Sequence, residues 1–143
     1  MEEKYEYGSP QWVKQAEKVI KDLIKGAGDS ADGVKYSVCE VYYNGPSHIS
    51  NEKGEVVWYF KIEGKQVSVG SEEIDSVDFK LMGDYKLLSQ MSRLLYGVPE
   101  DVKKLTELVK EAKKNGNMSY TGDNSKGPKY LAPMHNIMAK ITK

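Results

Sequence analysis

The sequence predicts an α+β protein in which helices cover one face of a mostly antiparallel sheet. Apolar residues recur at spacings of three and four over residues 12–24, which is typical of an amphipathic helix. They alternate over residues 56–69, and short polar turns join the strand-like runs that precede Leu81. Short turns favour antiparallel pairing over alternating βαβ units. With 143 residues we expect one domain, 1–143.

The first predicted helix begins at Ser9-Pro10, where a capping hydroxyl precedes proline at the first helical position. It ends near Gly26. Seven residues form its apolar stripe, namely Trp12, Val13, Ala16, Val19, Ile20, Leu23 and Ile24. We expect this stripe to pack on the sheet.

Three or more strands follow this helix. Residues 34–43 form a β-branched and aromatic run, and residues 55–69 predict a β-hairpin around the Glu63-Gly64-Lys65 turn. Alternate residues of the hairpin share one apolar face, led by Val56, Trp58, Phe60 and Ile62. A later strand carries Val77, Phe79 and Leu81 on one face and directs Asp78 and Lys80 outward.

The second half of the chain predicts two helices, a last strand and a broken tail. Asp84 caps a helix that Gly97 ends and that carries Leu87, Leu88, Met91, Leu94 and Leu95. A further helix spans Pro99 to Asn115, with a buried edge of Val102, Leu105, Leu108, Val109 and Ala112. Residues 117–121 predict a strand. The tail carries Pro128 and Pro133 and becomes helical after them.

Charge and cysteine content restrict the function classes. The 21 basic and 21 acidic residues cancel and neither sign forms a long run, so we expect no nucleic-acid partner. The single Cys39 forms no intramolecular disulfide, which favours the cytoplasm. The sequence contains no run of about 18 apolar residues, and its acidic start is unlike a signal peptide.

The sequence contains no recognisable catalytic or metal-binding set, so we expect no enzyme activity, metal or cofactor. His48 and His135 are the only histidines, too few with one cysteine for a standard zinc site. Cys39 sits in mid-strand and His48 beyond a turn, which disfavours a nucleophile-base pair. Helix capping explains Asp84 and Asp123 better than acid-base chemistry does.

Two stretches together resemble a known family. Residues 56–70 join a Trp-bearing strand to an Ile62-Glu63-Gly64-Lys65 turn and a second strand, and residues 78–88 end a strand in Gly83-Asp84 before a Leu-rich helix. This pattern, within residues 36–95, resembles the sterol carrier protein type 2 domain. The resemblance implies a five-stranded sheet with helices on one face that encloses an apolar tunnel for fatty acids, acyl-CoA, sterols or phospholipid tails. The helix 99–115 and the Pro-broken tail depart from the family pattern where the tunnel mouth is expected.

We therefore interpret the chain as a cytoplasmic carrier of a small hydrophobic ligand. The predicted ligand-binding residues are Trp58, Phe60, Phe79, Leu88, Met91, Leu95, Tyr120, Leu131, Met134 and Met138. Ordinary core packing is the alternative for each of them. Lys126 and Lys129 are candidates for contacting a polar headgroup, against the alternative of a solvated loop.

Two other functions stay open. The first is an accessory subunit that presents hydrophobic substrates to a lipid-metabolising enzyme. In that case we expect the helix Pro99 to Asn115 to dock on the enzyme through its Lys and Glu face. A small enzyme acting inside the same tunnel is the weakest of the three, because no nucleophile-base pair is evident. Transient contact with a membrane is compatible with the carrier and accessory hypotheses. The sequence does not decide the ligand, the oligomeric state, the pathway or whether the tail forms a lid.

Overall fold

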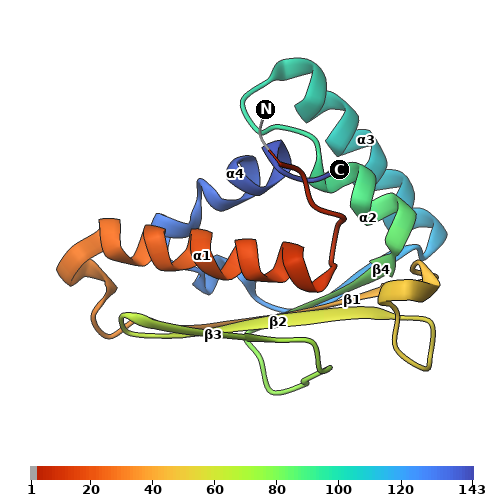
Figure 1. Ribbon diagram of the computed structural model, residues 1–143. Helices are drawn as coiled ribbons and strands as arrows, with labels where there is room; N and C mark the ends of the chain where they lie inside the picture. Colours follow the sequence, from red (N-terminus) through yellow and green to blue (C-terminus); the bar gives the residue numbers. More distant parts are fainter. Residues whose placement is uncertain (1–2) are drawn as a thin grey trace.

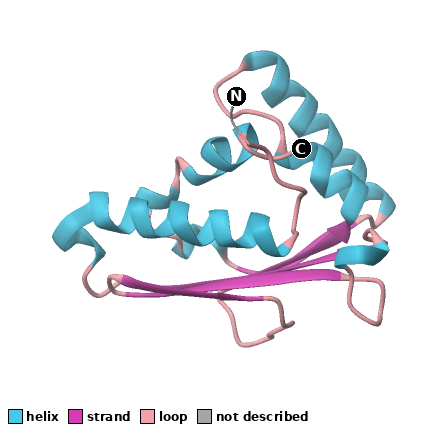
Figure 2. Cartoon of the chain, in the orientation of Figure 1, coloured by secondary structure: helices cyan, strands magenta, loops and turns pink. Residues whose placement is uncertain are grey.

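A computed structural model describes residues 3–143 as a five-stranded sheet with helices on one face (Figures 1 and 2). The strands are β1 (Lys35–Tyr43), β2 (Val56–Glu63), β3 (Gln66–Gly70), β4 (Phe79–Asp84) and β5 (Met118–Gly122). The helices are α1 (Pro10–Ala27), α2 (Tyr85–Ser92), α3 (Pro99–Asn115) and α4 (Met134–Lys140). The α+β class and the five-stranded sheet predicted above are confirmed.

The strand order is β3-β2-β1-β4-β5, so β1 occupies the centre of the sheet. Three of the four strand pairs are antiparallel, and β1 pairs with β4 in parallel. The chain forms the β2–β3 hairpin on one side of β1 and then crosses to the other side to form β4. This crossover explains why the sheet is mixed although the early connections are short.

The two faces of the sheet are both covered, but unequally. The large core on the helix side contains the alternate residues of β2, as predicted, with α1 packed over them. The other face carries a small cluster around Cys39, Val41 and Val57. The loop between β3 and β4 lies on this second face (Figure 1) and packs Ile74 and Val77 against the cluster.

The helix α1 begins and packs as the sequence predicts. The Ser9 hydroxyl accepts a hydrogen bond from the Trp12 backbone N–H, and Pro10 occupies the first helical position. Five stripe residues are fully buried, namely Trp12, Val13, Ala16, Ile20 and Ile24. Cap and stripe together fix the direction and the rotation of α1 over the sheet.

The second helix is shorter than predicted. Asp84 caps α2 as expected, but α2 ends at Ser92 instead of continuing to Gly97. Residues 94–96 form an irregular segment whose backbone groups bond to side chains from later in the chain. Asp101 accepts from the Leu95 N–H at 3.0 Å, and Asn136 exchanges two hydrogen bonds of 2.8 Å with the Tyr96 backbone. These side-chain partners replace the hydrogen bonds of the missing helical turn.

Two predicted orientations were also wrong. Lys80 does not point into solvent: it is only 8% exposed, and its ammonium binds Glu73 at 2.7 Å and Asp75 at 2.6 Å. The loop between β3 and β4 folds over this face and encloses the lysine stem. Most residues of the predicted buried edge of α3 are only partly buried. Ala112 alone among them is buried, and Val102 is 40% exposed.

The two ends of the described chain lie side by side. Tyr5 and Thr142 form a parallel β-bridge, with the Tyr5 N–H donating to the Ile141 carbonyl at 2.7 Å. Indole Nε1 of Trp12 donates to the Thr142 hydroxyl at 3.0 Å. The closing segment is thereby attached to α1, and both border the candidate site described next.

Candidate functional site

A cavity of about 600 Å³ lies between the helix-side face of the sheet and the surrounding helices. Its size falls within the range usual for small-molecule sites. Most of its wall is formed by apolar and aromatic side chains, and the cavity is partly open to solvent. The interior between sheet and helices is therefore hollow in this region.

Two rows of the sheet form the cavity floor. Strand register aligns Phe60, Val38 and Phe79 in one row across β2, β1 and β4. The adjacent row consists of Trp58, Glu40 and Leu81. Because side chains two positions apart in a strand share a face, both rows project toward the helices, and all six residues line the cavity.

Helices and the C-terminal segment form the walls. Leu88 and Met91 project from α2, Met134 and Met138 project from α4, and residues 124–132 supply the rest of that side. Gly83 lets α2 and the start of β5 lie close to β4, because a Cβ at this position would be 2.9 Å from the Asn117 carbonyl oxygen and 2.9 Å from a Leu88 methyl carbon. Glycine at this position is thus a packing requirement of the Leu88 wall.

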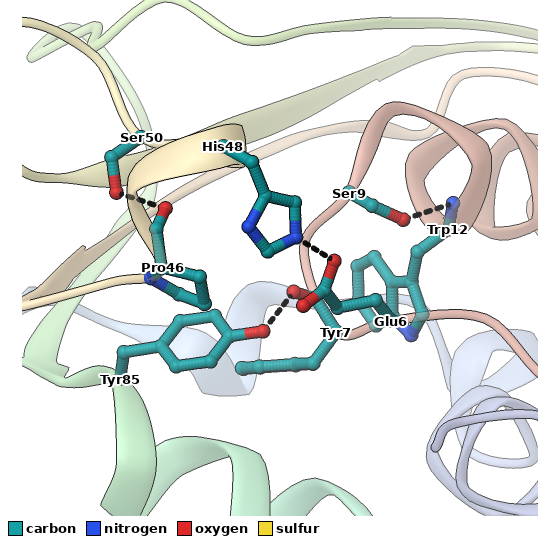
Figure 3. Close-up of polar contacts among 8 residues, drawn as sticks. All are labelled: Glu6, Tyr7, Ser9, Trp12, Pro46, His48, Ser50 and Tyr85. Atoms are coloured by element: carbon teal, nitrogen blue, oxygen red, sulfur yellow. Dashed lines mark hydrogen bonds and ion pairs between the residues drawn. The ribbon is translucent and has the colours of Figure 1, made fainter.

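The N-terminal segment closes one side of the cavity with aromatic rings. Figure 3 shows Tyr7 between Tyr85 and Trp12, where the Tyr85 hydroxyl donates to the Tyr7 carbonyl at 2.6 Å. The Tyr7 ring stacks on Tyr42 at 4.7 Å, and Trp12 packs edge-on against Trp58 at 5.2 Å. His48 binds the Glu6 carboxylate at 2.6 Å and fixes the same segment from outside.

Among residues 3–143, Glu40 is the one carboxylate that lines this mainly apolar cavity, and it lies in the middle of the floor. The Tyr42 hydroxyl donates to Glu40 Oε1, and Trp58 Nε1 donates to the Tyr42 oxygen at 2.7 Å and more weakly to Oε1 at 3.4 Å. Both hydrogen bonds that reach Glu40 from residues 3–143 go to Oε1, and the half-buried Glu40 side chain lines the cavity.

Burial controls the protonation of this group. Burial raises the pKa of the Glu40 carboxyl above its usual range, and the hydrogen bonds from Tyr42 and Trp58 only partly offset this effect. Burial and the nearby Glu40 charge also raise the pKa of the Tyr42 phenol, so Tyr42 stays a donor at neutral pH. The floor thus combines a protonated phenol with a carboxyl group that is costly to ionise.

Eight of the ten predicted ligand-binding residues line the cavity, namely Trp58, Phe60, Phe79, Leu88, Met91, Leu131, Met134 and Met138. Leu95 and Tyr120 do not line it. Leu95 lies in the irregular segment after α2, and Tyr120 is 50% exposed on the edge strand β5, where its ring packs against Phe79. Of the two loop lysines, Lys129 lines the cavity and Lys126 does not.

Sequence reasoning missed Glu40, Tyr7 and Trp12 as cavity residues. The signal for Glu40 was present, because strand alternation places it on the same face as Val38 and Tyr42. A charged residue on an otherwise apolar strand face indicates a candidate ligand-binding position. Tyr7 lies before α1 and outside any periodic apolar pattern, so the sequence pattern does not predict its place in the cavity wall.

Comparison with solved structures shows that the fold is known, although no protein-family profile and no curated protein matches the sequence. A conserved hypothetical protein of Thermus thermophilus, described as a candidate sterol carrier protein, is 10% identical and superposes with a TM-score of 0.53. The match covers 99% of this chain and 94% of that protein. The chain has a sterol-carrier-like fold.

Two further structures give weaker matches. The second sterol carrier protein domain of Helicoverpa armigera is 15% identical with a TM-score of 0.48, over 93% of this chain and 89% of that one. A UbiJ-SCP2 ubiquinone synthesis protein is 10% identical with a TM-score of 0.47, over 90% of this chain and 96% of that one. The fold assignment rests on the Thermus thermophilus structure, whose TM-score is 0.53.

Within this sterol-carrier-like fold, the residues considered for catalysis lie apart. Cys39 belongs to the cluster on the opposite sheet face, where burial raises the pKa of its thiol, and His48 binds Glu6 at the surface. His135 lines the cavity, but its Nε2 contacts the Leu94 carbonyl at 2.6 Å. In residues 3–143, no helix has the length and apolar character needed to cross a membrane. The cavity is thus a partly open, mainly apolar space with Glu40 in its floor.

Proposed function

We propose that this protein binds and carries a small hydrophobic molecule inside the cavity between sheet and helices. The observation that carries this proposal is the hollow itself, about 600 Å³ with a mainly apolar and aromatic lining. A closed core would gain packing energy by filling such a space, so an apolar hollow of this size is typical of a ligand site. Candidate ligands are fatty acids, acyl-CoA, sterol-like molecules and phospholipid tails, and the proposed location is the cytoplasm.

The composition of the walls supports a carrier of flexible ligands. Met91, Met134 and Met138 project into the cavity from α2 and α4. Methionine is unbranched and polarizable, so it adapts to ligands of irregular shape. Lys129 at the cavity wall is the proposed contact for a polar headgroup.

Purification without added ligand tests the proposal. Native mass spectrometry is expected to show the protein with a bound hydrophobic molecule that organic solvent extracts. Both tryptophans of the chain, Trp12 and Trp58, line the cavity, so adding a long-chain alcohol to the extracted protein is expected to change their fluorescence. A protein that copurifies with no hydrophobic molecule and shows no saturable change with alcohols, fatty acids or sterols would contradict a carrier function.

An accessory role in a lipid-metabolising complex is the second candidate, and exposed apolar side chains favour it. Tyr96, Val98 and Val102 at and before the start of α3 are 39–50% exposed, and Ile137 of α4 is 40% exposed. Asn136 binds the Tyr96 backbone, which brings these two segments together. If this surface docks on an enzyme, Val102→Glu is expected to abolish copurification of that enzyme, whereas Lys14→Glu, at an exposed position of α1, is expected to preserve it.

A further inference from the structure

We propose that Glu40 selects hydrophobic ligands that carry an uncharged hydroxyl group, which binds Glu40 inside the cavity, and that it disfavours ligands that bury a carboxylate there. This inference rests on the proposed carrier function and adds the chemical class of the ligand. It depends on the position of Glu40, on the hydrogen bonds that hold it, and on the absence of a compensating cation in the described residues.

The position of Glu40 makes it accessible to a bound molecule. It lies at the centre of β1, the central strand, with Trp58 and Leu81 as its neighbours in the row. Its side chain lines the cavity, whereas its sequence neighbours Cys39 and Val41 point to the opposite face. A molecule that contacts the floor of the cavity therefore meets the Glu40 carboxyl group between Trp58 and Leu81.

The hydrogen bonds hold the carboxyl group in a fixed orientation. Trp58 donates to Tyr42, and Tyr42 donates to Oε1 of Glu40. Both of the bonds that Glu40 accepts from side chains of residues 3–143 go to Oε1, and the half-buried Glu40 side chain lines the cavity. The chain of donors thus fixes one oxygen and leaves the other to a ligand.

Fold stability does not account for a glutamate at this position. Glu40 takes part in none of the ion pairs of residues 3–143, so no lysine or arginine contacts its carboxyl group. A buried carboxylate without a cation is costly, and glutamine accepts the same hydrogen bonds from Tyr42 and Trp58 without the charge. The structure therefore retains a costly group at the point where a ligand makes contact.

The ligand chemistry follows from the two protonation states of Glu40. An ionised carboxylate accepts a hydrogen bond, and a protonated carboxyl also donates one. A hydroxyl group both donates and accepts, so it satisfies Glu40 in either state. A ligand carboxylate repels the ionised form, and an ammonium group serves only the ionised form, which burial disfavours.

Probes that share one alkyl chain test this selection. We would titrate 1-dodecanol, dodecyl methyl ether, dodecanoate and dodecylamine into the extracted protein and follow the fluorescence of Trp12 and Trp58. We expect 1-dodecanol to bind roughly tenfold tighter than the ether, which lacks the donor, because a hydrogen bond to a charged or polarised partner has about this effect. Dodecanoate is expected to bind more weakly than 1-dodecanol.

Variants assign the preference to the carboxyl group. In Glu40→Leu the alcohol-to-ether ratio is expected to fall to about one and dodecanoate affinity to rise, because both the partner and the repulsion are removed. Glu40→Gln keeps an acceptor without charge and is expected to gain dodecanoate affinity while retaining part of the alcohol preference. Glu63→Gln, a change at an exposed end of β2, is the matched control and is expected to behave as the unmodified protein.

The outcomes separate the two proposals. If no probe binds the unmodified protein, the carrier function fails and this inference fails with it. If all probes bind without preference, or if Glu40→Leu keeps the alcohol preference, the carrier function stands and the role of Glu40 is overturned. Tighter binding of dodecylamine than of 1-dodecanol would overturn the hydroxyl class and indicate a cationic ligand.

Discussion

Glu40 stands out among the individual residues because its charge works against the folded state. Burial raises its pKa in the folded protein, so between the ordinary and the raised value the folded state binds more protons than the unfolded state. The free energy of unfolding therefore decreases as the pH rises through this interval. We therefore expect Glu40 to make the ligand-free protein less stable at neutral pH than an uncharged residue would.

Glu40→Gln is therefore expected to raise the melting temperature of the ligand-free protein at neutral pH. The gain is expected to shrink as the pH falls toward the ordinary pKa of glutamate, where the native carboxyl is protonated as well. Thermal unfolding followed by circular dichroism at both pH values measures this difference. Glu63→Gln serves as the control, and a Glu40→Gln protein that melts lower at neutral pH would contradict the prediction.

Lys80 shows the opposite case, a charge that stabilises its surroundings. Asp75 and Glu73 on the loop between β3 and β4 bind its ammonium, and these hydrogen bonds raise the pKa of Lys80. Lys80→Met keeps most of the apolar stem but removes both bonds. We expect faster hydrogen exchange in residues 71–78 and little change in the helices, measured by mass spectrometry. Lys35→Met, at the exposed start of β1, is the control and is expected to leave the hydrogen exchange of this loop unchanged.

Alternation along strands predicted which residues share a face, but it did not predict what covers each face. The rule places Lys80 opposite Phe79 and Leu81, and places Glu40 with Val38, both correctly. Assigning the face of Lys80 to solvent was wrong because a loop folds over it. Glu40 was overlooked because a charged residue was not expected to face the helices.

At the level of elements, the short helix α2 depends on its N-cap residue, Asp84. The Asp84 carboxylate accepts from the Leu87 N–H at 3.2 Å, and α2 contributes Leu88 and Met91 to the cavity wall. Asp84→Ala is expected to lower the free energy of unfolding by about 1 kcal/mol, the usual effect of losing an N-cap. Chemical denaturation measures this free energy. Asp84→Asn, which keeps a capping oxygen, is the control. Equal decreases in the free energy of unfolding in both variants would contradict a capping role.

Local signals predicted the starts of the elements better than their ends. Ser9-Pro10 and Asp84 begin α1 and α2 as expected, and Asn115-Gly116 ends α3, where Gly116 adopts a left-handed conformation. The end of α2 was mispredicted because Asp101, His135 and Asn136 hold the following segment. Such side-chain contacts to backbone groups, two of them from residues far along the chain, leave no periodic pattern.

At the scale of the whole molecule, the hollow makes an unusual substitution tolerable. Val38 lies on the cavity floor, so the larger side chain of Val38→Trp has space to occupy. In a closed core such a change costs about 1–3 kcal/mol, but here we expect an unchanged or higher melting temperature together with a loss of 1-dodecanol binding. Calorimetric titration measures the binding, and Ser119→Trp on the exposed face of β5 is the control. Strong destabilisation by Val38→Trp would indicate that the hollow is not available.

Sequence patterns alone did not predict the hollow, although they predicted most of its wall. Periodicity identifies the apolar side of each element but not whether opposing sides meet, because that depends on the spacing of helices and sheet. The resemblance to sterol carrier protein type 2 domains supplied the expectation of an enclosed space. Leu95 and Tyr120 were misplaced for separate reasons, a shortened helix and an edge strand.

The strict alternation along β1 couples ligand recognition to strand register. Cys39 and Glu40 differ by one position yet belong to opposite sides of the sheet. A one-residue insertion before Val38 that shifted the pairing would exchange them, turning a thiol toward the ligand and a carboxylate into the small cluster beneath. Substitutions can therefore retune the specificity of this strand gradually, whereas a single inserted or deleted codon would invert it.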